Sequence, residues 1–306
     1  RDHPAVRRSD KKATKEVKKA KRNFEKKLAK NIKQDKKSFF AYMRSKCRAR
    51  AQQVPLTDDK GRCLDETAEI TEEFNSYFTS VFTTEDLSNV PEPVKVCGAG
   101  GAGVLRDFDI SVEDVKDKLL KLRADKSGGP DELKPRLLLK ILEEISEPLC
   151  LLFNRSLKEG VVPGDWKNAN VCPIFKNGSR HLAANYRPVS LTSQICKVFE
   201  SLMRDVIVRH LEDNELLKDS QHGFRRGRSC LTNLLTFLDR VSGCLDEGEA
   251  VDVVFLDFAK AFDKVPHHRL SKKLQSHGID GEVRRWIEQW LSGRKQRVGI
   301  GGVMSS

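Results

Sequence analysis

The stretch VDVVFLDFAKAFDKVPHH, residues 251–268, places the strongest restriction on how this chain folds. Five of the six residues that begin at Val251 are apolar, which is typical of a strand buried on both faces of a sheet. The run ends at Asp257, and a second carboxylate, Asp263, follows it. A buried carboxylate is costly unless it is paired or bound to a metal. The sequence therefore predicts a buried strand over residues 251–257 and a partner for Asp257.

Three roles for Asp257 stay open on the local pattern alone. It can cap the N-terminus of a following helix, or it can form a salt bridge with Lys260. It can also hold Mg²⁺, which proteins bind through one or two carboxylates together with substrate phosphates. Phosphoryl-transfer enzymes with two metal ions need such a carboxylate as a shared ligand.

Helical periodicity accounts for most of the remaining chain. The predicted helices cover residues 10–48, the segment with Ile70, Phe74, Phe78 and Val81, the segment that begins near Ser111, residues 137–157 and 193–213, the segment from Ser229 to Gly248, and the segment with Val283, Trp286, Ile287, Trp290 and Leu291 that ends at Gly293. Helices interrupted by isolated strands and hairpins indicate an α+β fold.

Short strands are predicted at three places. LTDDKGRCL, residues 56–64, predicts a hairpin tip, and KQRVGIGGV, residues 295–303, predicts a final strand. Ala169, Val171 and Ile174 predict a strand that continues through the KNGS turn into a second arm, NYRPVSL. Lys176 lies near the tip of this hairpin and Arg187 on its second arm. Both cations suit phosphate oxygens, and the alternative, which such residues alone favour, is ordinary surface charge.

The net charge of +12 is concentrated in one segment. Residues 1–50 hold 20 Lys and Arg against 5 Asp and Glu, whereas the remaining residues hold 36 against 39. Such a segment attracts polyanions through phosphate neutralisation and counterion release. We expect it to contact nucleic acid; the alternative is a solvated basic helix without a ligand.

The cysteine spacing and the hydropathy exclude several classes of protein. None of the eight cysteines has a partner at C-x-x-C spacing, so we expect no zinc site, and small core residues in a reducing compartment instead. No apolar run reaches about 18 residues, so we expect no membrane span. Residues 84–106 are rich in Pro, Gly and polar residues and predict a linker between a basic helical region, 1–83, and a second domain, 107–306.

Several motifs resemble those of one family, the reverse transcriptases of non-LTR retrotransposons, or LINE elements of the jockey-like kind. FLDFAKAFDKVPH is similar to their first catalytic palm motif, and WKNANVCPIFKNGS and NYRPVSLTS are similar to their fingers motifs. QHGFRRGRSC, KSGGPDELKPRLL and FNSYFTSVFT resemble further blocks of the family, in the same order. The resemblance implies an RNA-directed DNA polymerase that copies RNA into DNA, with a partial right-hand fold of fingers and the first part of the palm.

The resemblance also implies roles for individual residues. Asp257 matches the ligand of both Mg²⁺ ions, which the Phe258 backbone carbonyl assists. Lys176 and Arg187 match the residues that hold the incoming triphosphate, and Phe262 matches a steric gate that excludes the 2′-hydroxyl of ribonucleotides. Asp263 is expected to have a structural or capping role. A family segment near template and nucleotide matches Gln221, Gly223, Phe224 and Arg225.

The family pattern continues beyond what this sequence contains. WIEQWLSGRKQRVGIGGVMSS matches the segment before a Gly-rich loop and a pair of adjacent aspartates, and neither occurs in these 306 residues. We therefore expect a chain truncated at both ends, which does not extend primers alone. The alternatives are a remnant that only binds nucleic acid, and an unfolded product without function.

The implied partners are an RNA template, a DNA primer or target, and dNTPs. The family assembles with its RNA in the cytoplasm and works at nuclear DNA, so the resemblance implies both locations.

Overall fold

A computed structural model describes residues 4–33, 35–46, 55–58, 60–96 and 103–306 of the chain. The chain divides into two compact units, Arg1–Val54 and Pro55–Ser306. The predicted boundaries around residues 84–106 remain predictions. Among the described helices, none combines the length and the apolar character needed to cross a membrane.

The first unit contains two helices where the sequence predicted one. Helix α1 spans Pro4–Lys30 and α2 spans Lys36–Lys46, with a turn between them, so a single helix over 10–48 is wrong. The rings of Phe24 and Tyr42 lie 5.5 Å apart, whereas one continuous helix would separate residues 18 positions apart by about 27 Å. The Tyr42 hydroxyl also donates to Glu25. The break therefore brings apolar side chains of α1 and α2 together.

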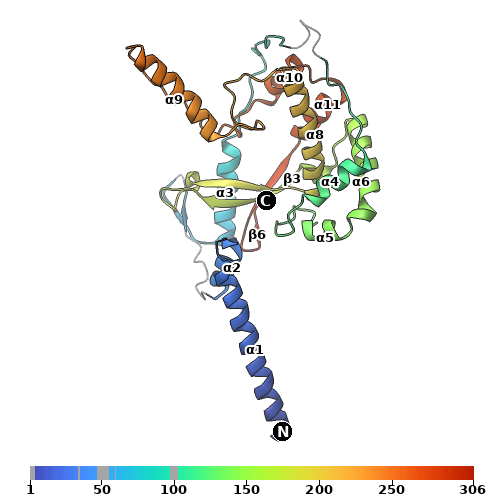
Figure 1. The fold of residues 1–306 in the computed structure, drawn as a ribbon, viewed down its shortest axis with the longest axis vertical. Coiled ribbons are helices and arrows are strands. Elements are labelled where there is room, and N and C mark those ends of the chain that lie inside the picture. The colour runs from blue at the N-terminus through green and yellow to red at the C-terminus, as the bar shows by residue number, and fades with distance from the viewer. Residues whose placement is uncertain (1–3, 34, 47–54, 59, 97–102) are drawn as a thin grey trace. The chain divides into compact units, whose positions relative to one another are not determined.

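The second unit mixes helices with short strands, as the sequence predicted for an α+β fold (Figure 1). Its elements, in chain order, are β1 (Leu56–Thr57), β2 (Cys63–Leu64), α3 (Thr67–Ser80), α4 (Val112–Leu120), α5 (Pro135–Lys140), α6 (Leu142–Glu159), α7 (Gly164–Lys167), β3 (Asn168–Phe175), the 3₁₀ helix η1 (Ala183–Asn185), β4 (Tyr186–Leu191), α8 (Gln194–Asp213), α9 (Cys230–Asp246), α10 (His267–Ser276), α11 (Gly281–Leu291), β5 (Lys295–Ile300) and β6 (Val303–Met304).

A four-stranded sheet in the order β4-β3-β5-β6 lies beside α3 in this unit. Strands β3 and β4 pair antiparallel with Ile174 opposite Arg187, which confirms the predicted hairpin. Strand β5 pairs in parallel with β3. The predicted strand over 295–303 is instead a hairpin, because Gly301 and Gly302 adopt positive φ values of 60° and 92° and turn the chain into β6.

Helices α4, α6, α8 and α11 enclose the larger core. The rings of Phe153 and Phe199 stack at 4.9 Å, and Trp286 meets Phe199 edge-on at 4.7 Å. The indole nitrogen of Trp286 donates to Ser156 Oγ at 2.9 Å, so burial leaves this polar group satisfied. A smaller core joins α3 to the sheet through Phe74, Phe78 and Val298, among others.

The helix starts were predicted better than the helix breaks. Ser111 and Asp114 form the capping box that begins α4, and Ser229 begins α9 in the same way. The helix expected over 137–157 is broken, because Ile141 leaves helical geometry and separates α5 from α6. No Gly or Pro stands at this break to announce it.

The buried strand predicted over residues 251–257 is wrong. These residues have no regular secondary structure, and Val254 and Leu256 are 79% and 91% exposed. A strand exists only through pairing with a neighbour, and no described segment pairs with this one. Helix α9, which precedes the run, projects from the rest of its unit with none of its residues buried (Figure 1).

The segment expected to be a linker lies against α10 and α11. Val96 N donates to Ser276 O at 3.0 Å, and Leu105 N donates to Gly278 O at 2.8 Å. Asp280 N in turn donates to Leu105 O at 2.9 Å. The segment that joins α3 to α4 is therefore held by backbone hydrogen bonds on both sides of residues 97–102.

Candidate functional site

The β3–β4 hairpin brings Lys176 and Arg187 to one face of the sheet. Ile174 faces Arg187 across the ladder, and Lys176 follows Ile174 by two residues, so all three point to the same side. The backbone continues the ladder past the strand end, because Lys176 N donates to Asn185 O at 2.8 Å. Diagonal neighbours of this kind lie about 7–8 Å apart. Both cations are exposed, and together they can hold one polyanionic group.

Asp257 is exposed and has no folded strand beneath it. No helix begins after it, since the next residues form turns and α10 begins only after Pro266, so the capping role is wrong. Within the described residues no donor reaches its carboxylate. Phe258, whose carbonyl was predicted to assist a metal, is also exposed.

One interpretation of the sequence was a salt bridge between Asp257 and Lys260. The structure does not contain it, because Lys260 contacts Tyr77 instead. Its ammonium donates to the Tyr77 hydroxyl at 2.7 Å and lies 4.3 Å from the centre of the Tyr77 ring. Lys260 also has a positive φ of 52°, a conformation in which a residue with a side chain is uncommon. Sequence reasoning missed Tyr77, and nothing local could have found it, because 183 residues separate the two partners.

Phe224 and Phe262, expected near template and nucleotide, meet edge-to-face. Their ring centres lie 6.5 Å apart, and the side chains are 92% and 82% exposed. Phe224 has a φ of 60°, a strained conformation for an aromatic residue. Two exposed rings at right angles provide a surface on which a base or a sugar can pack.

The loop that carries Phe224 is organised by its own polar side chains. Gln221 Nε2 donates to the Gly223 carbonyl at 3.1 Å, and Arg225 donates to the Lys218 carbonyl at 3.0 Å. His222 is buried and lies 3.0 Å from Thr232 Oγ1, next to the capping box of α9. The loop is therefore fixed at the start of α9 while Phe224 faces solvent.

Phe262 and Asp263 also border a groove of about 560 Å³. Other parts of its wall come from Phe78 in α3, from Pro188 and Ser190 in β4, and from Arg294, which follows α11. Asp263 lies in a turn and not at a helix cap, and its expected structural role stays a prediction. Pro188 and Ser190 alternate with Arg187 along β4, so this groove lies on the face of the sheet opposite to the one that carries Lys176 and Arg187.

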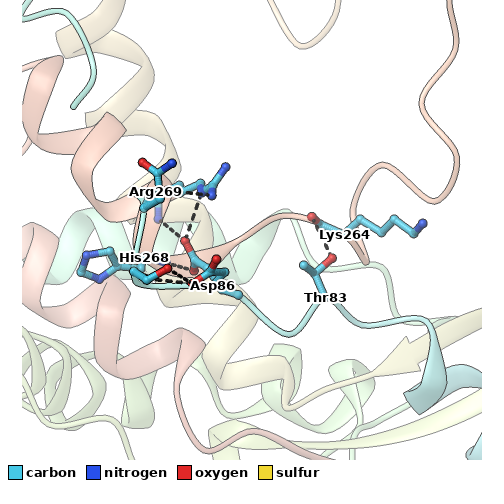
Figure 2. Close-up of polar contacts among 8 residues, drawn as sticks. Thr83, Asp86, Lys264, His268 and Arg269 are labelled. Atoms are coloured by element: carbon cyan, nitrogen blue, oxygen red, sulfur yellow. Dashed lines mark hydrogen bonds and ion pairs between the residues drawn. The ribbon is translucent and has the colours of Figure 1, made fainter. Parts of the chain in front are cut away.

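Residues 264–269, which follow Phe262, form hydrogen bonds with residues that follow α3 (Figure 2). The Thr83 hydroxyl donates to the Lys264 carbonyl at 3.3 Å. Glu85 accepts from the amides of His268 and Arg269 at 2.9 and 3.1 Å, at the N-terminus of α10.

Asp86 lies beside this helix end (Figure 2). Hydrogen bonds from the Ser88 side chain and amide lower the pKa of Asp86, and the nearby Arg269 acts in the same direction. These bonds keep a negative charge near the positive end of α10.

The metal-binding capacity of the site depends on Asp257. Among the described residues no three His, Cys, Asp or Glu side chains gather around one point. An exposed carboxylate and a neighbouring carbonyl fit one Mg²⁺ ion, whose remaining ligands are water and phosphate oxygens. A second ion needs further carboxylates, and among the described residues Asp257 is part of no group of three such side chains.

Comparison with known proteins gives a coherent result. Residues 174–304 match the family described as reverse transcriptase (RNA-dependent DNA polymerase). Over 198 residues the chain is 29% identical to the RNA-directed DNA polymerase from mobile element jockey of Drosophila funebris, which covers 64% of this chain and 22% of that protein.

Two proteins from Drosophila melanogaster are similar to this chain as well. The chain is 29% identical over 167 residues to the probable RNA-directed DNA polymerase from transposon BS, covering 54% of this chain and 18% of that protein. It is 24% identical over 273 residues to the corresponding protein from transposon X-element, covering 88% of this chain and 30% of that protein. The chain thus spans less than a third of the length of each of these relatives.

Proposed function

We infer that this chain, which carries a reverse transcriptase segment of the kind found in non-LTR retrotransposons, is the fingers and the first part of the palm of an RNA-directed DNA polymerase. The reaction joins a dNTP to a primer strand on an RNA template. Residues upstream of the matched segment, including the basic helix α1, hold nucleic acid. Assembly with RNA in the cytoplasm and synthesis at nuclear DNA belong to the same proposal.

One observation carries the proposal: the β3–β4 hairpin places Lys176 and Arg187 on the same exposed face. Neither cation has a carboxylate partner among the ion pairs of the described residues. Two neighbouring like charges repel each other, and a triphosphate relieves this repulsion. Arg187 offers a planar fork to two phosphate oxygens, while the Lys176 ammonium acts as a point charge.

The other site residues divide the remaining work. The Asp257 carboxylate and the Phe258 carbonyl hold Mg²⁺, which supplies charge neutralisation at the transferred phosphate when it is bound. Phe262 packs against the sugar and leaves no room for a 2′-hydroxyl. Gln221, Gly223, Phe224 and Arg225 form the neighbouring loop, in which the Phe224 ring lies against Phe262.

Equilibrium binding of a fluorescent dNTP to the 306-residue chain tests the hairpin. Lys176→Gln and Arg187→Gln each remove one cation, and each is expected to weaken binding about 10-fold, in line with a charge-assisted hydrogen bond worth about 1.5 kcal/mol. Lys140→Gln removes an exposed cation from α5 and serves as the matched control. Equal affinities of all three variants and the wild-type chain would remove the basis of the proposal.

A nucleic-acid-binding protein without catalysis is the second candidate. The observation that favours it is the exposed Asp257, which belongs to no group of three or more metal-ligating side chains among the described residues. On either reading the 306-residue chain alone does not extend a primer on RNA with dNTPs and Mg²⁺. If the wild-type chain synthesises DNA and Asp257→Asn abolishes that synthesis, the second candidate is excluded. The same result would show that the metal ligands of this chain suffice for catalysis.

A further inference from the structure

The turn between Asp257 and Phe262 is anchored from outside by Tyr77. This tyrosine lies in the last turns of α3, half-buried beside the core residues Phe74 and Phe78. Its hydroxyl and ring hold the Lys260 ammonium at 2.7 Å and 4.3 Å respectively. A hydrogen bond and a cation–π contact made by one residue to one ammonium fix where that charge lies.

Two further contacts hold the same stretch of chain against residues that follow α3. Thr83 binds the Lys264 carbonyl, and Glu85 binds the amides at the start of α10. Lys260, Lys264 and His268 are therefore each tied to positions 77–85. Three contacts therefore hold this stretch of chain against α3 and the residues that follow it, and the contact with Tyr77 is the one that fixes the Lys260 ammonium.

The consequence concerns the charge around Asp257. Lys260 follows Asp257 by three residues, close enough for its flexible side chain to reach the carboxylate if nothing else held it. An ammonium there would compete with a divalent cation for the same oxygens. We propose that Tyr77 is a positioning residue that keeps the Lys260 ammonium off Asp257 and so leaves this carboxylate free for a divalent metal ion. This inference rests on the metal-binding role proposed for Asp257.

Coulomb's law gives the size of the effect. A single positive charge about 6 Å from a divalent ion, at the dielectric constant of water and with screening by physiological salt, weakens binding of that ion about threefold, and about tenfold without screening. Releasing Lys260 from Tyr77 is therefore expected to raise the half-saturating concentration of a divalent ion about three- to tenfold.

The test uses Mn²⁺ and the methyl NMR signals of Val253, Val254 and Leu256 in the 306-residue chain. Bound Mn²⁺ broadens these signals, so their broadening measures occupancy at Asp257. Tyr77→Leu keeps an apolar side chain in α3 and releases Lys260, and it is expected to shift half-saturation upward. The double variant Tyr77→Leu, Lys260→Met is expected to return it to the wild-type value, which a merely structural role for Tyr77 does not predict.

Matched variants separate the possible failures. Thr83→Val removes a neighbouring anchor without touching Lys260, and its half-saturation is expected to equal that of the wild-type chain. If Thr83→Val shifts half-saturation as much as Tyr77→Leu does, the effect comes from a general loss of order in this segment and not from the charge of Lys260. If Asp257→Asn leaves the broadening intact, Asp257 does not bind the metal ion, and both the proposed metal role and this inference are refuted. If Asp257→Asn abolishes the broadening and Tyr77→Leu changes nothing, only this inference falls.

A spectroscopic signature makes the contact testable without any substitution at Tyr77. Protons near an aromatic ring face resonate upfield, so the ε-methylene signal of Lys260 in the wild-type chain is expected to lie upfield of the other lysine signals. An ordinary chemical shift for this methylene would overturn the proposal even if the Tyr77→Leu variant failed to fold.

Discussion

The basic face of α1 allows a prediction with a worked magnitude. At 100° per residue, Val17, Phe24 and Leu28 fall on one side of the helix. Six exposed basic residues fall on the opposite side: Lys15, Lys18, Lys19, Arg22, Lys26 and Lys30. A helix of 27 residues is about 40 Å long, so one strand of nucleic acid can run along this face past all six side chains.

Counterion release converts six phosphate contacts into a salt dependence. Each contact contributes about −0.7 to the slope of log affinity against log salt for a single strand, and about −0.9 for a duplex. Six contacts then give slopes of about −4 and about −5. Raising the salt from about 50 to about 200 mM is expected to lower affinity about 300-fold for single-stranded RNA and about 2,000-fold for a duplex.

Fluorescence anisotropy with a labelled single-stranded RNA, repeated over a range of salt concentrations, measures the slope. Replacing the six residues of α1 by Gln removes the charges and keeps a good helix former, so the slope is expected to fall by about 4. A matched control replaces six exposed basic residues of the second unit by Gln: Lys121, Lys126, Lys140, Arg155, Lys158 and Arg209. Equal loss of slope in the two variants would refute the assignment of the nucleic-acid contact to α1.

Three predictions concern the fold that supports the site. Gly129→Ala is expected to lower the free energy of unfolding, measured with denaturant, by about 1–3 kcal/mol, because the added Cβ would lie 2.5 Å from the Thr192 carbonyl group. Gly164→Ala is the control, because a Cβ at Gly164 meets nothing within 4 Å. Phe199→Ala is expected to lower the free energy of unfolding by about 3–5 kcal/mol, because it empties the centre of the aromatic cluster; a loss below 1 kcal/mol would contradict that packing.

The hydrogen bond from Arg284 at 2.8 Å holds the pKa of Asp280 below its ordinary value of 3.8. The ionised Asp280 therefore stabilises the fold above pH 3.8, and this stabilisation is lost as the pH falls through the lower pKa of the folded state. The stability difference between the wild-type chain and Asp280→Asn is therefore expected to shrink on acidification below about pH 4, and a difference that grows there would contradict the assignment.

Local patterns predicted the elements whose stability is itself local. Helices α3, α8 and α11 each place a continuous apolar stripe on one face, and their existence follows from periodicity alone. The β3–β4 hairpin was predictable because its two arms follow one another in the chain and the KNGS turn lies between them, although the connection also contains η1. The breaks between α1 and α2 and between α5 and α6 were missed because no Gly or Pro marks them. At the first break the local signal is Asp35, which accepts from the Ser38 amide at the start of α2.

Non-local pairing explains the larger error. Val251–Leu256 has the composition of a buried strand, but composition states only that burial would be favourable. A strand also needs a neighbour that accepts its backbone hydrogen bonds, and such a neighbour is not adjacent in sequence. The same limit applies to Tyr77 and Lys260, whose contact joins segments 183 residues apart.

The position of Asp257 now bears on the three roles that the sequence left open. A helix cap needs a helix directly after it, and the first helix to follow, α10, begins after Pro266. A salt bridge needs Lys260, whose ammonium is held by the Tyr77 hydroxyl. A metal ligand needs an accessible carboxylate without a competing cation, and Asp257 is exposed in this way. Two of the three roles conflict with the geometry, so metal binding is the one of the three that the contacts of Lys260 leave open, and the Mn²⁺ titration of the Asp257→Asn variant tests it.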